Sequence, residues 1–145
     1  MAAKLIIIGH RGAAGLAEEN SLEGIRQSIK HNVDMIELDL RVKDSVVILS
    51  HDKPSSNIVY CPLKQALSEV NGKVPLNLEV KQKSVVKKLP KLLEKYTGEI
   101  VFSSSSYSTL KEIREVLPQY EIAIIEKWSS LRAVAESVLL NTKQR

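Results

Sequence analysis

Short apolar runs alternate along the chain with longer stretches in which apolar residues recur at helical spacing. The runs are typical of buried strands, and the longer stretches are typical of helices that bury one face. We predict strands at residues 5–8, 35–40, 46–49, 76–80, 100–102 and 122–125. We predict helices at residues 21–31, 63–70, 84–96, 108–117 and 131–140, with the third bent or restarted at Pro90.

This alternation predicts an α/β domain with a mainly parallel sheet. The first run, Leu5–Ile8, is wholly apolar, as expected of a strand buried on both faces. Only Arg41–Ser45 separate the second and third strands, which is too short for a helical crossover, so a local hairpin remains an alternative there. Asn20 and Glu23 have the spacing of a capping box, which predicts the start of the first helix.

Size and composition fit one globular domain over residues 1–145, with 43% hydrophobic and 26% charged residues. Cys61 is the single cysteine, so an intrachain disulfide is excluded. No segment approaches the roughly 20 apolar residues that cross a membrane. The apolar run Leu5–Ile8 is too short for a signal peptide, and we therefore expect a cytoplasmic protein.

The formal net charge is +4, and six lysines fall between Lys81 and Lys95. They alternate with the apolar positions of a predicted helix, which indicates its solvated face. No aromatic residues stand between them to stack on bases, so we expect no nucleic-acid partner.

Polar residues that can carry chemistry stand at the ends of the predicted strands. They are His10, Arg11, Glu37, Asp39, His51, Glu79, Lys81 and Ser103–Ser105. In parallel α/β folds the carboxyl ends of the strands share one rim, where ligands bind and catalytic residues lie. The sequence therefore predicts a site at this rim.

Glu37 and Asp39 are two positions apart on a strand, so their side chains point to the same face. They repel each other unless a cation or protons neutralise them. With Glu79 from the fourth strand, they offer the hard oxygen ligands that Mg²⁺ and Ca²⁺ prefer. The alternative is a pair of exposed strand carboxylates matched with Lys or Arg, and the two-residue spacing alone favours that alternative.

His10 and His51 each follow a predicted strand, and imidazoles are natural general acids and bases near neutral pH. Structural or metal-binding histidines are the alternative. Arg11 can clamp a phosphate through its planar fork, and Lys81 points to the same face as Glu79. The chain has no phosphate-binding glycine loop, zinc spacing or serine nucleophile elbow.

Six short motifs follow one another over about the first 80 residues of the chain. They are His10-Arg11-Gly12, Glu19–Leu22, Met35–Leu40, Lys43-Asp44, His51-Asp52 and Leu76–Lys81. In this order they resemble the glycerophosphodiester phosphodiesterase family. The resemblance implies a parallel (β/α)₈ TIM barrel with the site at its C-terminal rim.

The resemblance also implies roles for the rim residues. His10 and His51 match the acid/base pair, and Glu37, Asp39 and Glu79 match the ligands of one divalent cation, Mg²⁺ or Ca²⁺. Residues matching the substrate- and phosphate-binding positions are Arg11, Lys81 and Glu19. The implied reaction is metal-dependent hydrolysis of a glycerophosphodiester to glycerol 3-phosphate and an alcohol. Alternatives are action on lysophospholipid or sphingolipid headgroups, and a non-catalytic, incomplete barrel.

Four departures from the family pattern matter. Glu18 stands where the family usually has Pro, and Ser105-Ser106 stand where it commonly has Ser-Phe. The stretch from His51 to Leu76 is too short for the family's substrate-defining insertion. We count about six strands where the barrel needs eight, so we expect an incomplete barrel whose open edges, at residues 5–8 and 122–125, could recruit other chains.

Overall fold

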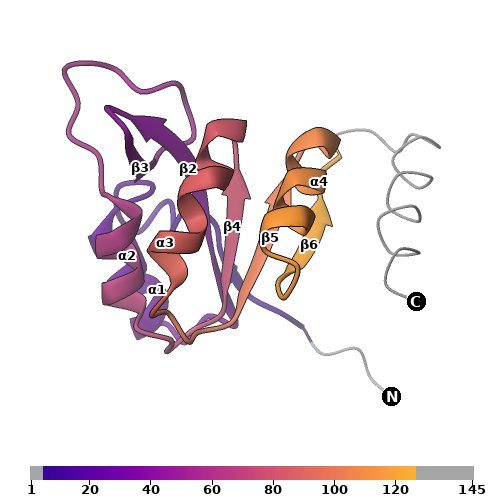
Figure 1. Ribbon diagram of the computed structural model, residues 1–145. Coiled ribbons are helices and arrows are strands. Elements are labelled where there is room, and N and C mark those ends of the chain that lie inside the picture. Colours follow the sequence, from indigo (N-terminus) through magenta and orange to yellow (C-terminus); the bar gives the residue numbers. More distant parts are fainter. Residues whose placement is uncertain (1–4, 127–145) are drawn as a thin grey trace.

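A computed structural model describes residues 5–126 (Figure 1). Its elements are β1 (Ile8–Gly9), α1 (Leu22–Lys30), β2 (Met35–Lys43), β3 (Val46–Leu49), α2 (Leu63–Val70), β4 (Leu76–Val80), η1 (Lys83–Lys88), α3 (Leu89–Leu93), β5 (Ile100–Ser104), α4 (Tyr107–Val116) and β6 (Glu121–Ile124). The predicted order is confirmed, and the helix expected around Pro90 restarts there, as a 3₁₀ turn followed by α3. The helix predicted at residues 131–140 lies outside the described residues.

The sheet has the order β1-β2-β4-β5-β6, and all neighbours in this order are parallel. β3 leaves this path and pairs antiparallel with β2, from Leu40↔Leu49 to Lys43↔Val46. Asp44 and Ser45 form the two-residue turn between them, and both have the positive φ that tight hairpins require. The short link between β2 and β3 is therefore a hairpin. Of the six strands between residues 5 and 126, five run parallel.

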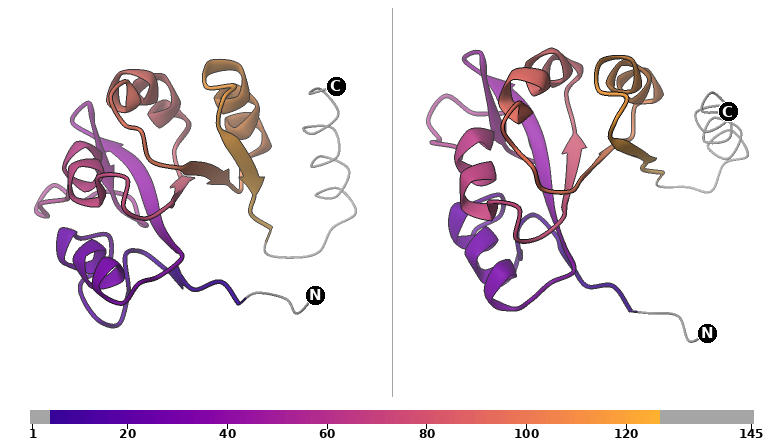
Figure 2. Two further views of the ribbon diagram at one scale, coloured as in Figure 1. Left: turned by 90° about the horizontal axis from the view of Figure 1, so that it is seen from below. Right: turned by 60° about the horizontal axis from the view of Figure 1, so that its bottom comes forward.

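Seen along the strands, the sheet curves into an arc with the helices on its outer side (Figure 2). Ile36, Leu38 and Leu40 of β2 point into this helix layer and are fully buried. The alternate residues Glu37 and Asp39 consequently point to the inner face. The expectation of an incomplete, TIM-barrel-like α/β fold is confirmed.

The run Leu5–Ile8 departs from its prediction. Only Ile8 and Gly9 are paired as a strand, and the exposed fractions of residues 5 to 8 fall from 81% at Leu5 to 49% at Ile8. A wholly apolar run predicts burial on both faces, but β1 is an edge strand that pairs only with β2 among the described residues. The prediction of a strand buried on both faces was wrong, whereas the open edge expected at residues 5–8 is present among the described residues. Within residues 5–126, no helix combines the length and apolar character needed to cross a bilayer.

This exposed edge should make the chain self-associate, because unpaired apolar strands recruit other chains. Light scattering on the purified chain should report a species heavier than one 16.2 kDa chain. Ile6→Lys should shift this species toward the monomer, whereas Val116→Lys, which places the same charge on an exposed apolar position of α4, should not. A monomer at every concentration would contradict the prediction.

The start of α1 also differs from its prediction. Ser21 is the N-cap, and its Oγ accepts a hydrogen bond of 3.0 Å from Gly24 N. Asn20 has a left-handed φ of 54°, which turns its side chain away from the helix. The predicted capping box of Asn20 and Glu23 was wrong, because Asn20 bonds to β2 instead.

Candidate active site

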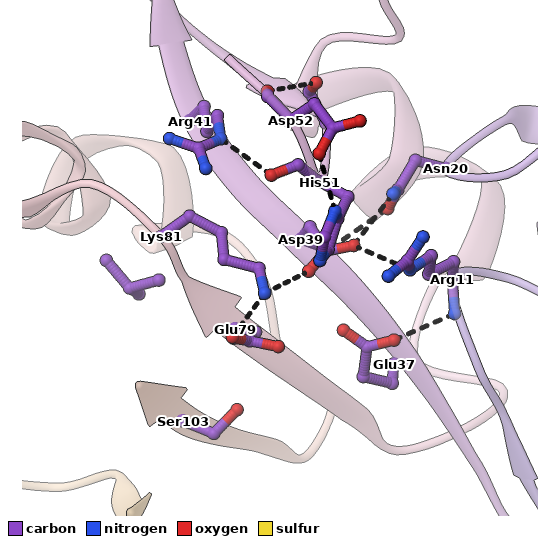
Figure 3. A network of polar contacts seen from close by, with 12 residues as sticks. Arg11, Asn20, Glu37, Asp39, Arg41, His51, Asp52, Glu79, Lys81 and Ser103 are labelled. Carbon is purple, nitrogen blue, oxygen red and sulfur yellow. Dashed lines mark hydrogen bonds and ion pairs between the residues drawn. The ribbon is translucent and has the colours of Figure 1, made fainter. Parts of the chain in front are cut away.

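Three carboxylates meet on the inner face of the sheet, where the sequence predicts them (Figure 3). Glu37 and Asp39 come from β2 and Glu79 from β4, and β-pairing places Asp39 directly beside Glu79. Oxygen atoms of all three lie within 4.8 Å of one another. Glu37 and Asp39 are 7% and 1% exposed, so the alternative of two exposed strand carboxylates is wrong.

Asp39 is the best-held member of this cluster. Its Oδ2 accepts from Asn20 Nδ2 at 2.9 Å, and its backbone N–H donates to Asn20 Oδ1 at 3.0 Å. Lys81 Nζ lies 3.3 Å from Oδ1, and Arg11 Nε lies 3.6 Å from Oδ2. Two cations and an amide therefore fix the orientation of this carboxylate.

Glu37 is the least satisfied member. Its Oε2 accepts from Arg11 N at 2.8 Å, but its Oε1 is buried without a hydrogen-bond partner among the described residues. Burial, reinforced by the charges of Asp39 and Glu79, raises the pKa of Glu37 to about 7. A buried oxygen without a partner and an unfavourable carboxylate charge both fit a site for a divalent cation.

Arg11 and Lys81 lie on opposite sides of Asp39 (Figure 3). Lys81 Nζ bridges Asp39 and Glu79, at 2.6 Å from Glu79 Oε1. Arg11 donates from its terminal nitrogen to Glu19 Oε2 at 2.7 Å, and this bond is the main reason that the pKa of Arg11 is raised. The two cations flank the carboxylates, so a phosphoryl group bound there would have positive charge on both sides.

The two histidines lie at the solvent side of this cluster. The His10 side chain is 68% exposed, and its Nε2 is 3.8 Å from Glu37 Oε2. The His51 side chain is 38% exposed, and its Nδ1 is 2.9 Å from Asp52 Oδ1. Both imidazoles are therefore accessible to solvent, as groups that exchange protons with a substrate must be.

Two further residues position the site, and one of them, Arg41, was missed in the sequence. Asn20, at the start of the first helix, reaches the rim and binds Asp39. Arg41 continues the two-residue spacing of Glu37 and Asp39 along β2, and its Nε donates to the backbone oxygen of His51 at 2.9 Å. Arg41 thus holds the backbone that carries an expected catalytic histidine.

Replacing Asn20 by alanine should lower the free energy of unfolding by about 2 kcal/mol, because buried polar groups of Asp39 lose two partners. Urea unfolding of the two proteins measures this difference. Asn32→Ala is the matched control, since Asn32 shares the left-handed backbone, with φ of 52°, but is exposed. Equal losses in the two variants would show that backbone strain, and not the bonds to Asp39, explains the effect.

The model of the glycerophosphoryl diester phosphodiesterase family matches residues 10–61, a range that contains both histidines, Arg11, Glu19, Glu37 and Asp39. The Bacillus subtilis protein named "Putative glycerophosphodiester phosphodiesterase YhdW" is 45% identical over 49 residues, which cover 33% of this chain and 20% of that protein. Mouse lysophospholipase D GDPD1 is 27% identical over 140 residues, which cover 85% of this chain and 44% of that protein. The chain thus spans less than half the length of these curated relatives.

Solved structures share the fold. An Oleispira antarctica phosphodiesterase, solved in complex with the product sn-glycerol-3-phosphate, superposes with a TM-score of 0.86 at 17% identity. The match covers 94% of this chain and 72% of that one. The resemblance predicted from the sequence motifs is therefore confirmed, because residues 10–61 match the model of the glycerophosphoryl diester phosphodiesterase family and the solved structures share the fold.

Proposed function

We propose that the chain carries the catalytic rim of a metal-dependent phosphodiesterase, which hydrolyses a glycerophosphodiester to glycerol 3-phosphate and an alcohol. The observation that carries the proposal is the buried cluster of Glu37, Asp39 and Glu79, with two cations beside it and two exposed imidazoles above it. The match of residues 10–61 to the family model supports the reaction class.

In this proposal Glu37, Asp39 and Glu79 hold one Mg²⁺ or Ca²⁺. Such an ion supplies positive charge that stabilises developing negative charge on the phosphoryl oxygens. Arg11 and Lys81 bind the phosphate from either side, and Glu19 fixes the direction of the Arg11 guanidinium. Asn20 keeps Asp39 in place while the substrate binds and leaves.

The histidines move the protons. One imidazole takes a proton from the attacking oxygen, which belongs to water or to the neighbouring hydroxyl of the substrate, and the other gives a proton to the leaving alcohol. Attack by the neighbouring hydroxyl would form a cyclic phosphate that water then opens. Asp52 bonds to His51 Nδ1, which leaves Nε2 of that ring as the atom that exchanges a proton.

A second substrate class, lysophospholipids, is favoured by the mouse relative named a lysophospholipase D, because that match extends over 85% of this chain. Sphingolipid headgroups have no comparable support. A non-catalytic role remains the third alternative, since the described strands form only an arc of the barrel.

Removal of the metal should abolish hydrolysis. The 145-residue chain is incubated with glycerophosphocholine or with lysophosphatidylcholine, in Mg²⁺, in Ca²⁺ or in EDTA, and free choline or glycerol 3-phosphate is measured. We expect release from at least one substrate with metal and none above background with EDTA. Release that is equally fast in EDTA would reject the metal, and no release under any condition would favour the non-catalytic role.

A further inference from the structure

A wide hollow lies outside the carboxylate cluster, on the helix side of the sheet. Its lining residues belong to α2, to η1 and α3, and to the β2–β3 hairpin. Figure 1 shows where these elements lie in the fold. Its volume is about 920 Å³, and none of the expected site residues lines it. Apolar side chains form much of its wall, among them Val46, Leu67, Leu92 and Tyr96.

Lysines surround this hollow. Five line it, and Glu94 is the one acidic residue among the lining residues; the five are Lys64, Lys87, Lys88, Lys91 and Lys95. None of their ammonium groups forms an ion pair or hydrogen bond with another residue between 5 and 126. By contrast, Lys81 and Lys83 in the same segment are paired with acids. The predicted solvated face of this helix therefore converges with α2 on an unneutralised positive hollow.

Exposed apolar side chains stand on the β2–β3 hairpin, which borders the hollow, and on the loop that is bonded to this hairpin. Val46, at its edge, is 48% exposed and pairs with Lys43 in the hairpin. The Lys43 ammonium donates to the backbone oxygen of Ile58 at 2.8 Å, which binds the loop before α2 to the same hairpin. In this loop Ile58 is 51% exposed and Val59 is 99% exposed. The loop follows directly after His51.

We propose that these five lysines, together with Val46, Ile58 and Val59, form a docking surface for an anionic lipid bilayer. Lysines close to a bilayer are attracted to its anionic headgroups, and apolar side chains beside them enter the interface. The proposal rests on the proposed phosphodiesterase function and deepens it, because docking through the loop after His51 would bring the catalytic rim to lipid substrates.

A bilayer fits this surface better than a nucleic acid does. The apolar wall and the exposed Ile58 and Val59 have no counterpart on a phosphate backbone. Tyr96, the one aromatic residue of the hollow, is partly buried against the core and is poorly placed to stack on bases. An acidic peptide could occupy the hollow, but Ile58 and Val59 are not among its lining residues. Such a peptide would therefore leave these two exposed side chains uncovered, whereas a bilayer would contact them as well.

Vesicle sedimentation tests the proposal with the full chain. Phosphatidylcholine vesicles with and without phosphatidylglycerol are mixed with wild type, with the triple variant Lys87→Gln, Lys91→Gln, Lys95→Gln, and with a control triple variant. The control, Lys30→Gln, Lys73→Gln, Lys111→Gln, removes the same charge from exposed lysines elsewhere. A separate Val59→Ser variant tests the apolar contact.

We expect wild type to sediment only with the anionic vesicles. The hollow variant should bind about 100-fold more weakly, and the control should change by a few-fold at most. Val59→Ser should weaken binding while leaving the charge unchanged. All variants should hydrolyse water-soluble glycerophosphocholine like wild type, so a failure of docking is distinguishable from a failure of catalysis.

Three results would overturn the proposal. The first is recovery of all wild-type protein in the supernatant with anionic vesicles, and the second is an equal loss of binding by the two triple variants. Binding of polyuridylate or of a polyglutamate peptide in the hollow, with no sedimentation on vesicles, would assign the surface to another class of partner.

Discussion

Replacing His10 or His51 by alanine should lower the turnover of a glycerophosphodiester by about 10²- to 10⁴-fold, the usual contribution of general acid/base groups. Both imidazoles face solvent, and within residues 5–126 they contact Glu37 and Asp52 rather than the core. Truncation therefore removes a proton-transfer group without opening a cavity. Turnover of each purified variant is measured beside its urea unfolding curve.

His31→Ala is the matched control, because His31 is an exposed histidine at the C-cap of α1 and lies outside the carboxylate cluster. It should retain the wild-type rate. Asp52→Asn should give a smaller loss than His51→Ala, since it disturbs only the bond to Nδ1 of that ring. A near-normal rate in His10→Ala or His51→Ala would remove that residue from the proposed mechanism.

The carboxylate cluster could be predicted from the sequence because strand geometry is regular. Side chains alternate between faces, so Glu37 and Asp39 had to share one face while Ile36, Leu38 and Leu40 shared the other. Parallel strands bring their carboxyl ends to one rim, which placed Glu79 near them. These inferences need only the period of a strand and the direction of the chain.

The predictions that were wrong concern residues whose placement depends on contacts between distant segments of the chain. Capping preferences describe a helix in isolation, and they assigned Asn20 to the cap although Asp39, 19 positions along, offers it a buried partner. Apolar pattern predicts that Leu5–Ile8 prefers burial, but whether another strand covers it depends on the arrangement of the whole sheet. The lysine hollow likewise arises only when α2 and α3 come together.

Charge decides how this site behaves without a metal. Three carboxylates face two cations, and the cations contact them unevenly. Lys81 contacts Asp39 and Glu79, whereas within residues 5–126 Glu37 accepts a hydrogen bond only from a backbone N–H. The electrostatic cost of the cluster is therefore concentrated on Glu37, whose pKa is raised to about 7, chiefly by burial. Glu37 is thus the position at which metal binding, protonation and stability are most tightly connected.

Glu37→Gln should remove most of the pH dependence of stability in the metal-free protein. The pKa of Glu37 is about 7 in the folded protein, compared with an ordinary value of 4.5, so folding favours the protonated form. The stabilisation that protonated Glu37 contributes to the folded state is complete below pH 4.5 and is lost as the pH rises through 7. At about 1.4 kcal/mol for each pKa unit, wild type should lose about 3 kcal/mol of unfolding free energy across this window.

In EDTA, the gain in unfolding free energy of Glu37→Gln over wild type should therefore be about 3 kcal/mol larger at pH 8 than at pH 4.5. In Mg²⁺ or Ca²⁺ at pH 8 the difference in unfolding free energy between the two proteins should shrink or change sign. The ion stabilises the protein that binds it, and the variant lacks one ligand. Calorimetric titration should show at least about tenfold weaker metal binding by the variant. Glu121→Gln, at an exposed position of β6, is the control. Its unfolding free energy and metal affinity should match those of wild type under every condition. Parallel pH profiles for wild type and Glu37→Gln would contradict the raised pKa, and equal metal affinities would exclude Glu37 as a ligand.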